Sequence, residues 1–433
     1  MNKQILRLAI PNVISNISVP LLSIVDTKLM GELYEPAYLG AVAIGAIIFN
    51  FLYWSMGFLR MGTTGITAQA FGRNDAKVII LTLAQALLVA VVAGLAILLL
   101  QYPIEQACFY LISASQEVED LARTYYGIRV WAAPATIAVF AFNGWFLGMQ
   151  NAKYLMFITL VINGVNIILS WLFVVHFGME VVGVAWSTVI AQYMGLMAAI
   201  GLFFKKYQAY IPYFEQQLLF QLKVFKQFFD VNKDIFIRTI CLLFTFTFFT
   251  MESAKGGDVV LAANKLLLEY LMLMSYATDG FAFAAESLTG KYFGAKNKPL
   301  LLKSIRYAFY WGAVFAGFTT LVYALAGTQL IVLFTDNTAI IAAASDYIWW
   351  IVWLPIVSIG AYIWDGVYVG LTASVAMRNT MVVATLVFYL PVYYWLVPYY
   401  GNHALWMALF SFMLARTVLQ TVLAPKYVYR LLD

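Results

Sequence analysis

Residues 65–75 read GITAQAFGRND, and residues 287–297 read SLTGKYFGAKN. The two stretches lie 222 residues apart (287 − 65) and share a threonine, a phenylalanine and a glycine at matching positions. A second pair has the same offset: NGWFLG at residues 143–148 matches DGVYVG at residues 365–370 and aligns two more glycines. Because chance matches in separate segments would not share one register, the sequence predicts that the chain is a duplication of one unit.

The composition around these matches is that of a membrane protein. Of 433 residues, 63% are hydrophobic and only 11% are charged, whereas a soluble domain carries about 25% charged residues. The apolar residues fall into runs of about 20 or more, which is the length that a helix needs to cross a bilayer. We predict twelve spans, roughly at residues 6–31, 37–60, 78–101, 125–149, 153–177, 181–204, 231–252, 258–288, 303–334, 341–370, 377–398 and 403–429.

The predicted fold is therefore an all-α polytopic membrane protein with twelve transmembrane helices in two six-helix lobes. Six spans per half is an even number, so the two halves enter the membrane in the same sense and form a parallel pseudo-twofold repeat about an axis along the membrane normal. The predicted domains are an N-terminal lobe at 1–204, a cytoplasmic linker at 205–230 and a C-terminal lobe at 231–433. Within the linker, QQLLFQLKVFKQFF has apolar residues on one face, which is typical of an amphipathic helix lying on the inner leaflet or of a linker helix that covers helix ends.

Charged residues in the loops predict the orientation. Basic residues cluster in alternate loops, for example at Arg73, Lys77 and Lys205, while the opposite loops hold mainly acids. By the positive-inside rule both termini are cytoplasmic. The first apolar run is too long for a cleaved signal segment, so the first span is expected to stay, and the expected location is a bacterial inner membrane.

The first span carries an acid and two prolines. It reads LRLAIPNVISNISVPLLSIVDTKLM over Leu6–Met30 and includes Asp26. A carboxylate within a membrane span costs roughly 2.5–3.5 kcal/mol on insertion scales and is by default a functional candidate. Pro11 and Pro20 remove backbone donors from the same helix and favour a bend, so we predict them to be hinges.

Polar residues on spans five and six are candidates to join Asp26. Asn166 and Ser170 are four residues apart and share one face of span five, Asn163 lies one turn earlier, and Thr188 lies on span six. Amide and hydroxyl oxygens beside a carboxylate can orient a protonated acid or coordinate a hard cation. The alternative is a set of interhelical hydrogen bonds that hold the helices together.

A second polar set lies mainly in the C-terminal half. Asp279 and Glu286 are one heptad apart on span eight, Arg238 on span seven is a candidate partner for them, and Arg60 lies in span two. This group is either a structural charge network or part of substrate and proton handling. Asp365 is a second buried acid with aromatic neighbours, a combination that suits a cationic amphiphile through charge and cation–π attraction.

At these motifs the chain resembles the multidrug and toxic compound extrusion (MATE) family, and within it the DinF branch. The matching pieces are IPNVISNISVPLLSIVDTKLMG, GFLRMGTTGITAQAFG, NIILSWLF, DGFAFAAESLTGKYFGAKN, DGVYVG and MRNTM, and the resemblance covers nearly the whole chain. It implies that Asp26 is the family's first-helix acid, Asn166 its fifth-helix asparagine and Thr188 its sixth-helix threonine. Ser170 departs from the pattern, because many relatives have an aspartate there, and this weakens the case for sodium.

The resemblance implies a secondary antiporter that exports amphiphilic, cationic compounds in exchange for protons by alternating access, and not an enzyme. No cofactor beyond the coupling proton is expected, with Na⁺ as the alternative coupling ion. The expected partners are small amphiphilic or cationic substrates and membrane lipids, with no nucleic acid, and a monomer is expected to be sufficient for function. The rival functions are sodium-coupled efflux by the same fold and a lipid-linked glycan flippase of the same superfamily. The second-lobe acid of some relatives would match Asp365, although the DinF branch is usually argued to couple through the first lobe.

Overall fold

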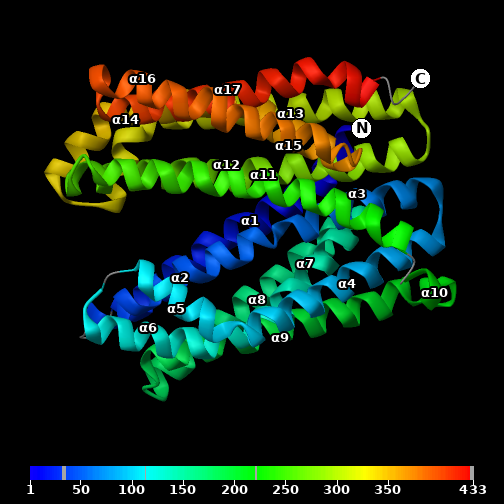
Figure 1. The fold of residues 1–433 in the computed structure, drawn as a ribbon, viewed down its shortest axis with the longest axis horizontal. Helices are drawn as coiled ribbons and strands as arrows, with labels where there is room; N and C mark the ends of the chain where they lie inside the picture. The colour runs from blue at the N-terminus through cyan, green and yellow to red at the C-terminus, as the bar shows by residue number, and fades with distance from the viewer. Residues whose placement is uncertain (32–35, 113, 220–221, 430–433) are drawn as a thin grey trace. The chain divides into compact units, whose positions relative to one another are not determined.

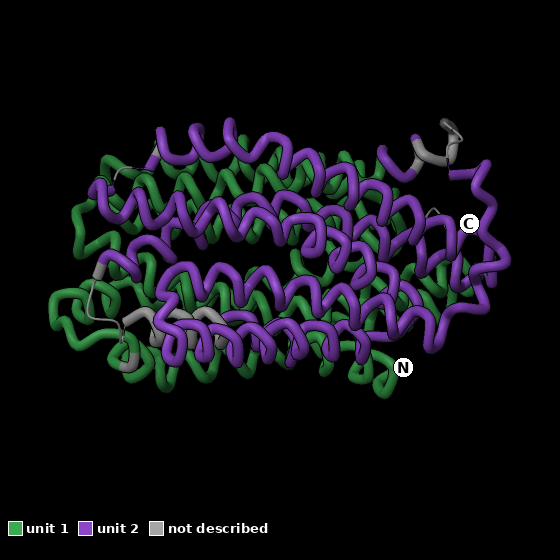
Figure 2. Tube along the Cα trace, turned by 90° about the horizontal axis from the view of Figure 1, so that it is seen from below, with its two compact units in different colours: residues 1–13, 230–433 green, residues 14–229 purple. Residues whose placement is uncertain are grey.

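The computed structural model is helical, with no strand among the residues that it describes (Figure 1). It describes the backbone at 1–31, 36–112, 114–219 and 222–429, and the side chains there except at 21–31, 36, 111, 222–225, 227 and 333. The chain divides into two compact units (Figure 2). We call residues 14–229 the N-terminal unit, and residues 1–13 with 230–433 the C-terminal unit.

The N-terminal unit contains the later part of α1 and the helices up to the linker. Its elements are α1 (Asn2–Gly31, which begins in the other unit), α2 (Pro36–Ser55), α3 (Gly57–Arg73), α4 (Ala76–Leu99), α5 (Gln101–Leu111), α6 (Gln116–Arg129), η1 (Val130–Ala132), α7 (Ala133–Gly148), α8 (Ala152–Trp171), η2 (Leu172–His176), α9 (Glu180–Tyr207), η3 (Gln208–Tyr213) and α10 (Gln216–Leu219). Within this unit α3 and α4 pack against α7, and α8 packs against α9.

The C-terminal unit contains the remaining helices. Its elements are α11 (Leu222–Ala254, whose first turns belong to the N-terminal unit), α12 (Asp258–Gly294), α13 (Lys298–Phe334), α14 (Thr338–Gly370), α15 (Ser374–Val383), η4 (Ala384–Tyr389), α16 (Leu390–Tyr400), α17 (Asn402–Ala424) and η5 (Pro425–Tyr429). Here α14 is central and packs against α12, α13 and α17.

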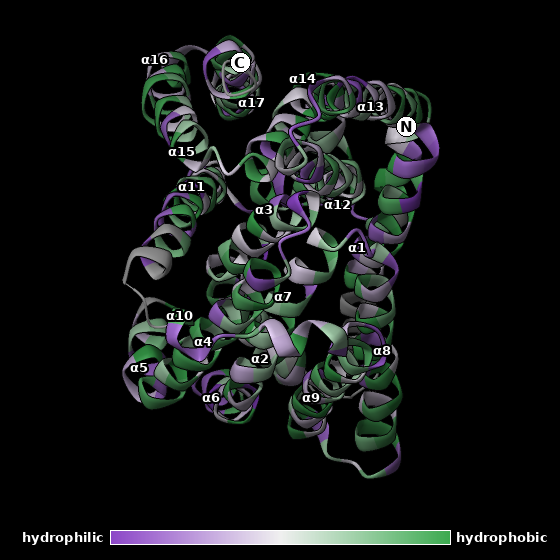
Figure 3. Cartoon of the chain, turned by 90° about the vertical axis from the view of Figure 1, so that its right-hand side faces the viewer, coloured by the Kyte–Doolittle hydropathy of each residue, from purple (hydrophilic) through white to green (hydrophobic). Residues whose placement is uncertain are grey.

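The helices have the length and composition of membrane spans. Eleven helical segments from Ala37 onward, within the part of the chain that the structure describes, are long and apolar enough to cross a membrane. The 30-residue helix α1 precedes them and brings the number to the predicted twelve. Apolar residues cover most of the helix surfaces (Figure 3).

Matching glycines confirm the duplication at the level of single contacts. A Cβ added at Gly144 would lie less than 3.0 Å from the Arg60 carbonyl oxygen, and a Cβ at Gly366 would lie less than 3.0 Å from the Ala282 carbonyl oxygen. The two glycines are 222 residues apart, and so are their two partners. Gly148 and Gly370 repeat the pattern, because each would meet a threonine that lies at the same offset from its counterpart. The same helix pair, α3 with α7 and the end of α12 with the end of α14, is therefore built twice.

The turns repeat in the same register. Left-handed backbone occurs at Asn74 (φ 56°) and again 222 residues later at Lys296 (φ 53°). The residue after each turn caps the next helix, because the side chain of Asp75 accepts from the backbone N–H of Val78 and that of Asn297 accepts from Leu300, both at 3.1 Å. A repeat first read from a few letters thus extends to backbone angles and helix caps.

The second span is longer than predicted. The sequence prediction ended it at residue 60, whereas α3 continues to Arg73. The polar residues Thr63, Thr64, Thr67 and Gln69 lower the hydropathy of this stretch, but all four are buried, and the Thr64 hydroxyl donates to the carbonyl oxygen of Arg60 at 2.9 Å. Threonine bonded to the preceding turn keeps its polar group satisfied inside a helix.

The linker is partly helical. η3 and α10 follow span six, and α11 begins at Leu222 and continues without a break into span seven. The apolar face predicted for the amphipathic helix falls largely on residues 220–225 and 227, whose side chains lie outside the described residues.

Candidate functional site

A cluster of uncharged polar side chains joins α8 to α9 in the N-terminal unit. The Asn166 side-chain amide donates to the Thr188 hydroxyl at 3.0 Å. One turn further along α8, the Ser170 hydroxyl lies 3.4 Å from the Asn166 side-chain oxygen. The structure therefore brings together three of the residues that the sequence predicted for ion coupling.

Two further residues of this cluster were not predicted. Ser170 shares a 2.6 Å hydrogen bond with Ser187, and both are fully buried. Asn163 donates to the Ser18 hydroxyl at 2.8 Å and so connects α8 to α1. Sequence reasoning missed Ser18 and Ser187 because serine is common in spans, and only the packing of the helices shows which serines face Asn163 and Ser170.

Asp26 lies on α1, two helical turns beyond Ser18, but its side chain lies outside the described residues. The cluster beside this helix consists of amide and hydroxyl groups that donate and accept hydrogen bonds without carrying charge. Ser170 contributes a hydroxyl where a second carboxylate would double the negative charge of a cation site.

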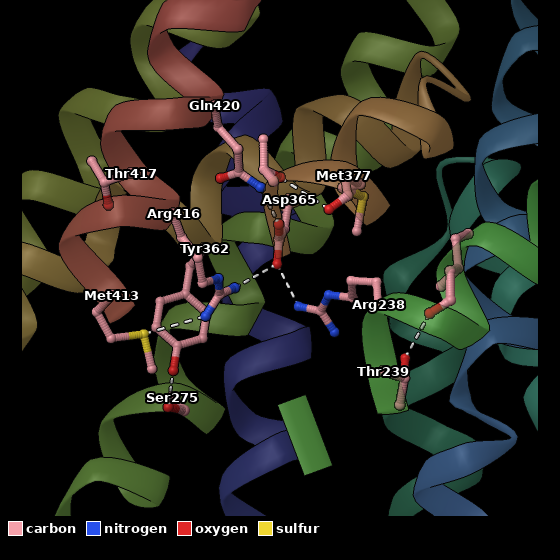
Figure 4. Close-up of polar contacts among 12 residues, drawn as sticks. Arg238, Thr239, Ser275, Tyr362, Asp365, Met377, Met413, Arg416, Thr417 and Gln420 are labelled. Atoms are coloured by element: carbon pink, nitrogen blue, oxygen red, sulfur yellow. Dashed lines mark hydrogen bonds and ion pairs between the residues drawn. The ribbon is translucent and has the colours of Figure 1, made fainter. Parts of the chain in front are cut away.

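The acid of the C-terminal unit is surrounded by cationic and amide donors (Figure 4). Asp365 on α14 accepts from Arg238 of α11 and, at 2.8 Å, from Arg416 of α17. Its second oxygen accepts from the Gln420 side-chain amide at 2.6 Å. Three helices are joined at one carboxylate.

This cluster is buried and carries more positive than negative charge. Asp365 is 5% exposed and Arg416 only 1%, and the two guanidinium groups outnumber the one carboxylate. Arg416 also lies 5.9 Å from the ring centroid of Tyr362, whose hydroxyl is hydrogen-bonded to Ser275. Such a carboxylate is neutralised by its own neighbours, so its charge is already engaged within the protein.

The predicted partnership of Arg238 differs from the observed one. The sequence offered Arg238 as a partner for Asp279 and Glu286, whereas the structure pairs it with Asp365. Asp279 lies close enough to Tyr362 for an electrostatic interaction, and Glu286 is 1% exposed on the same helix, α12. Arg60 lies on α3 in the N-terminal unit.

The sequence analysis did not identify Arg416 and Gln420 as site residues. A signal was present, because an arginine inside an apolar span is costly unless it is paired. The glutamine four residues later, on the same helix face, is a natural second donor. What the sequence lacked was the position of α17 relative to α14.

The predicted hinges lie within an unbroken helix. α1 runs from Asn2 to Gly31 and includes Pro11, which is buried, and Pro20, which is partly buried. Next to Pro11, the Asn12 side-chain amide donates to the carbonyl oxygen of Leu8 at 2.8 Å.

Comparison with known proteins gives the family. The MatE family model matches residues 11–172 and 235–395, which is more than half of the chain. The chain belongs to the MATE family. It is therefore a membrane transporter and not an enzyme.

Individual relatives agree with this MATE assignment. The chain is 38% identical over 417 residues to DNA damage-inducible protein F of Escherichia coli K12, covering 96% of this chain and 90% of the relative. It is 26% identical over 182 residues to a probable multidrug resistance protein NorM of Bacillus subtilis, covering 42% of this chain and 40% of the relative. A solved transporter of the MOP superfamily from Pyrococcus furiosus has the same fold, with a TM-score of 0.90 at 20% identity over 100% of this chain and 97% of the solved one.

Proposed function

We propose that this MATE transporter exports amphiphilic, cationic compounds in exchange for protons by alternating access, and that Asp26 carries the proton. The observation that supports this most is the Asn166–Thr188–Ser170 hydrogen-bonded cluster, which lies on the two helices where the family resemblance puts coupling residues. A single acid beside neutral donors can exchange a proton, because burial favours its uncharged form.

The difference between the two units supports assigning the coupling to the N-terminal one. Asp365 is held by two guanidinium groups and an amide, so protonating it would leave buried positive charge without a counter-charge. Asp26 has no such arginine near it in the sequence; Lys28 is the only nearby basic residue. Protonation at Asp26 therefore carries a smaller electrostatic penalty.

In the proposed cycle, Asp26 takes up a proton from outside and loses attraction for the polar groups around it. α1 then bends at Pro20 or Pro11, where a backbone N–H is missing, and the substrate is displaced. We place the protein in a bacterial inner membrane with both termini in the cytoplasm, acting as a monomer.

The test is counterflow of a fluorescent organic cation from liposomes that contain the purified full-length protein. With Asp26→Asn, export driven by a pH gradient is expected to fall to the level of empty liposomes, while Asp346→Asn, which alters an exposed acid on α14, transports normally. Normal pH-driven exchange by the Asp26 variant would overturn the mechanism.

Sodium coupling is the alternative that the same cluster permits, since its amide and hydroxyl oxygens are suitable ligands for a hard cation. A sodium gradient imposed at constant pH separates the two. If the sodium gradient drives export and the pH gradient does not, the coupling ion is sodium.

A further inference from the structure

We infer that a surface pocket of the C-terminal unit binds the headgroup of an anionic phospholipid, with Arg306 as the phosphate ligand. The pocket has a volume of about 460 Å³ and lies where α13, α14, α17 and η5 meet. Its walls combine one guanidinium, one hydroxyl and apolar or aromatic side chains, contributed among others by Arg306, Phe309, Trp364, Thr421 and Tyr429.

The charge of the pocket is uncompensated. α13, α17 and η5 contain no aspartate or glutamate, whereas α13 carries Lys298 and Lys303 before Arg306, and η5 carries Lys426. Arg306 is exposed and has no ion pair among the residues that the structure describes. Lys303 lies one helical turn before Arg306, so the two cations are neighbours on the helix surface.

A second surface pocket gives an internal comparison. It has a volume of about 550 Å³ and also contains an arginine, Arg123. Arg123 is bound by Glu105 at 2.8 Å and by Glu119 at 2.7 Å. Two carboxylates thus occupy the guanidinium that a phosphate would need, while at Arg306 those positions are open to a ligand.

The depth of Arg306 along its helix suits a headgroup. α13 has 37 residues and is therefore about 55 Å long at 1.5 Å per residue, compared with about 40–45 Å for a bilayer including its headgroups. Arg306 lies eight residues after Lys298, about 12 Å from the helix start. In a helix centred on the bilayer, this is the level at which headgroups meet hydrocarbon, and there tryptophan and tyrosine are also enriched.

Apolar side chains continue from the pocket along both helices. On α13 the ridge that starts at Arg306 continues through exposed apolar residues, namely Tyr310, Val314, Phe318, Leu321 and Leu325. On α17, Val418 and Leu414 follow Thr421 in the same direction and are also exposed. An acyl chain attached to a headgroup at Arg306 has this surface to lie on, which a free phosphate does not need.

A lipid phosphate fits the polar side of the pocket. The guanidinium group presents parallel N–H donors that bind phosphate in a bidentate manner. The Thr421 hydroxyl donates to the carbonyl oxygen of Thr417 and accepts from the Trp364 indole at 2.8 Å, which fixes both side chains in the pocket wall. Basic pockets between transmembrane helices at the membrane surface are a recurring form of anionic lipid recognition.

The test measures lipid binding and does not depend on transport. The purified full-length protein is analysed by native mass spectrometry with dioleoylphosphatidylglycerol, dioleoylphosphatidylcholine or glycerol phosphate. We expect phosphatidylglycerol to bind in preference to phosphatidylcholine, and Arg306→Gln to weaken it about fivefold, the effect of removing one cation from such a surface. Arg306→Lys should keep most of the affinity, and Lys205→Gln, which removes an exposed lysine of α9 in the other unit, should change it less than about twofold.

Three results would overturn the inference. Unchanged phosphatidylglycerol binding in Arg306→Gln would exclude Arg306 as the ligand. Equal binding of phosphatidylcholine would show a groove that selects only acyl chains. Displacement of the lipid by glycerol phosphate at equal concentration would show a site for free phosphate.

Discussion

Replacing Asp365 by asparagine tests whether the acid of the C-terminal unit holds the helices together or handles a proton or substrate. The carboxylate accepts from two guanidinium groups and an amide while only 5% exposed. The asparagine side chain would be nearly isosteric but neutral, so Arg238 and Arg416 would keep buried positive charge with no counter-charge. Removing one partner of a buried ion pair typically costs about 3–5 kcal/mol.

The assay is thermal unfolding of the purified protein in detergent. For a unit of about 200 residues, a loss of about 3–5 kcal/mol corresponds to a fall in Tm of roughly 6–20 °C. The control is Asp346→Asn, which alters an exposed acid on the same helix and should change the stability by no more than about 0.5 kcal/mol. Asp365→Asn combined with Arg416→Gln removes one of the two cations and should recover part of the loss.

A variant with normal Tm would refute this reasoning. If Asp365→Asn unfolded at the same temperature as the unaltered protein and still lost transport, the carboxylate would act in substrate or proton handling. If both properties were lost together and the double variant recovered only stability, the ion pairs would have both roles.

Three further outcomes follow from the contacts. Gly366→Ala should destabilise the protein by about 1–3 kcal/mol or more, since its Cβ would meet the Ala282 carbonyl, while Gly317→Ala, with open space around it, should be neutral in the same melting assay. Asn264→Ala should cost about 1–3 kcal/mol, measured as a fall in Tm, because it removes the partner of Ser253, Asn402 and Trp406; an unchanged Tm would contradict the importance of that network. Ser170→Asp adds a buried carboxylate, so its Tm should fall in sodium-free buffer and rise again with NaCl but not with choline chloride.

The repeat was predictable because it rests on residues whose role is local. A glycine that touches a neighbouring backbone and a cap residue after a left-handed turn leave the same letters at the same offset, as at Gly148 and Gly370 or around Asn74 and Lys296. The number of spans followed from apolar length in the same way. The end of the second span did not, because buried threonines lowered the hydropathy of a stretch that is helical.

The partners within the polar sites were harder to predict. Asn166 and Ser170 lie on one helix, so their spacing already placed them together. Arg238 had several acids to choose from along the sequence, and its pairing with Asp365 depends on how α11, α14 and α17 pack. The contact between Ser170 and Ser187 likewise depends on how two helices face each other.

The packing of Gly144 and Gly366 has an evolutionary consequence. Each glycine touches the backbone of its neighbour, at Arg60 in one unit and at Ala282 in the other. Because the contact uses the carbonyl oxygen, the side chain at that position is free to change without altering the helix crossing. A duplicated gene could thus place a cation in one copy and a methyl group in the other while both copies kept the same architecture, and specialisation of the two halves required no new fold.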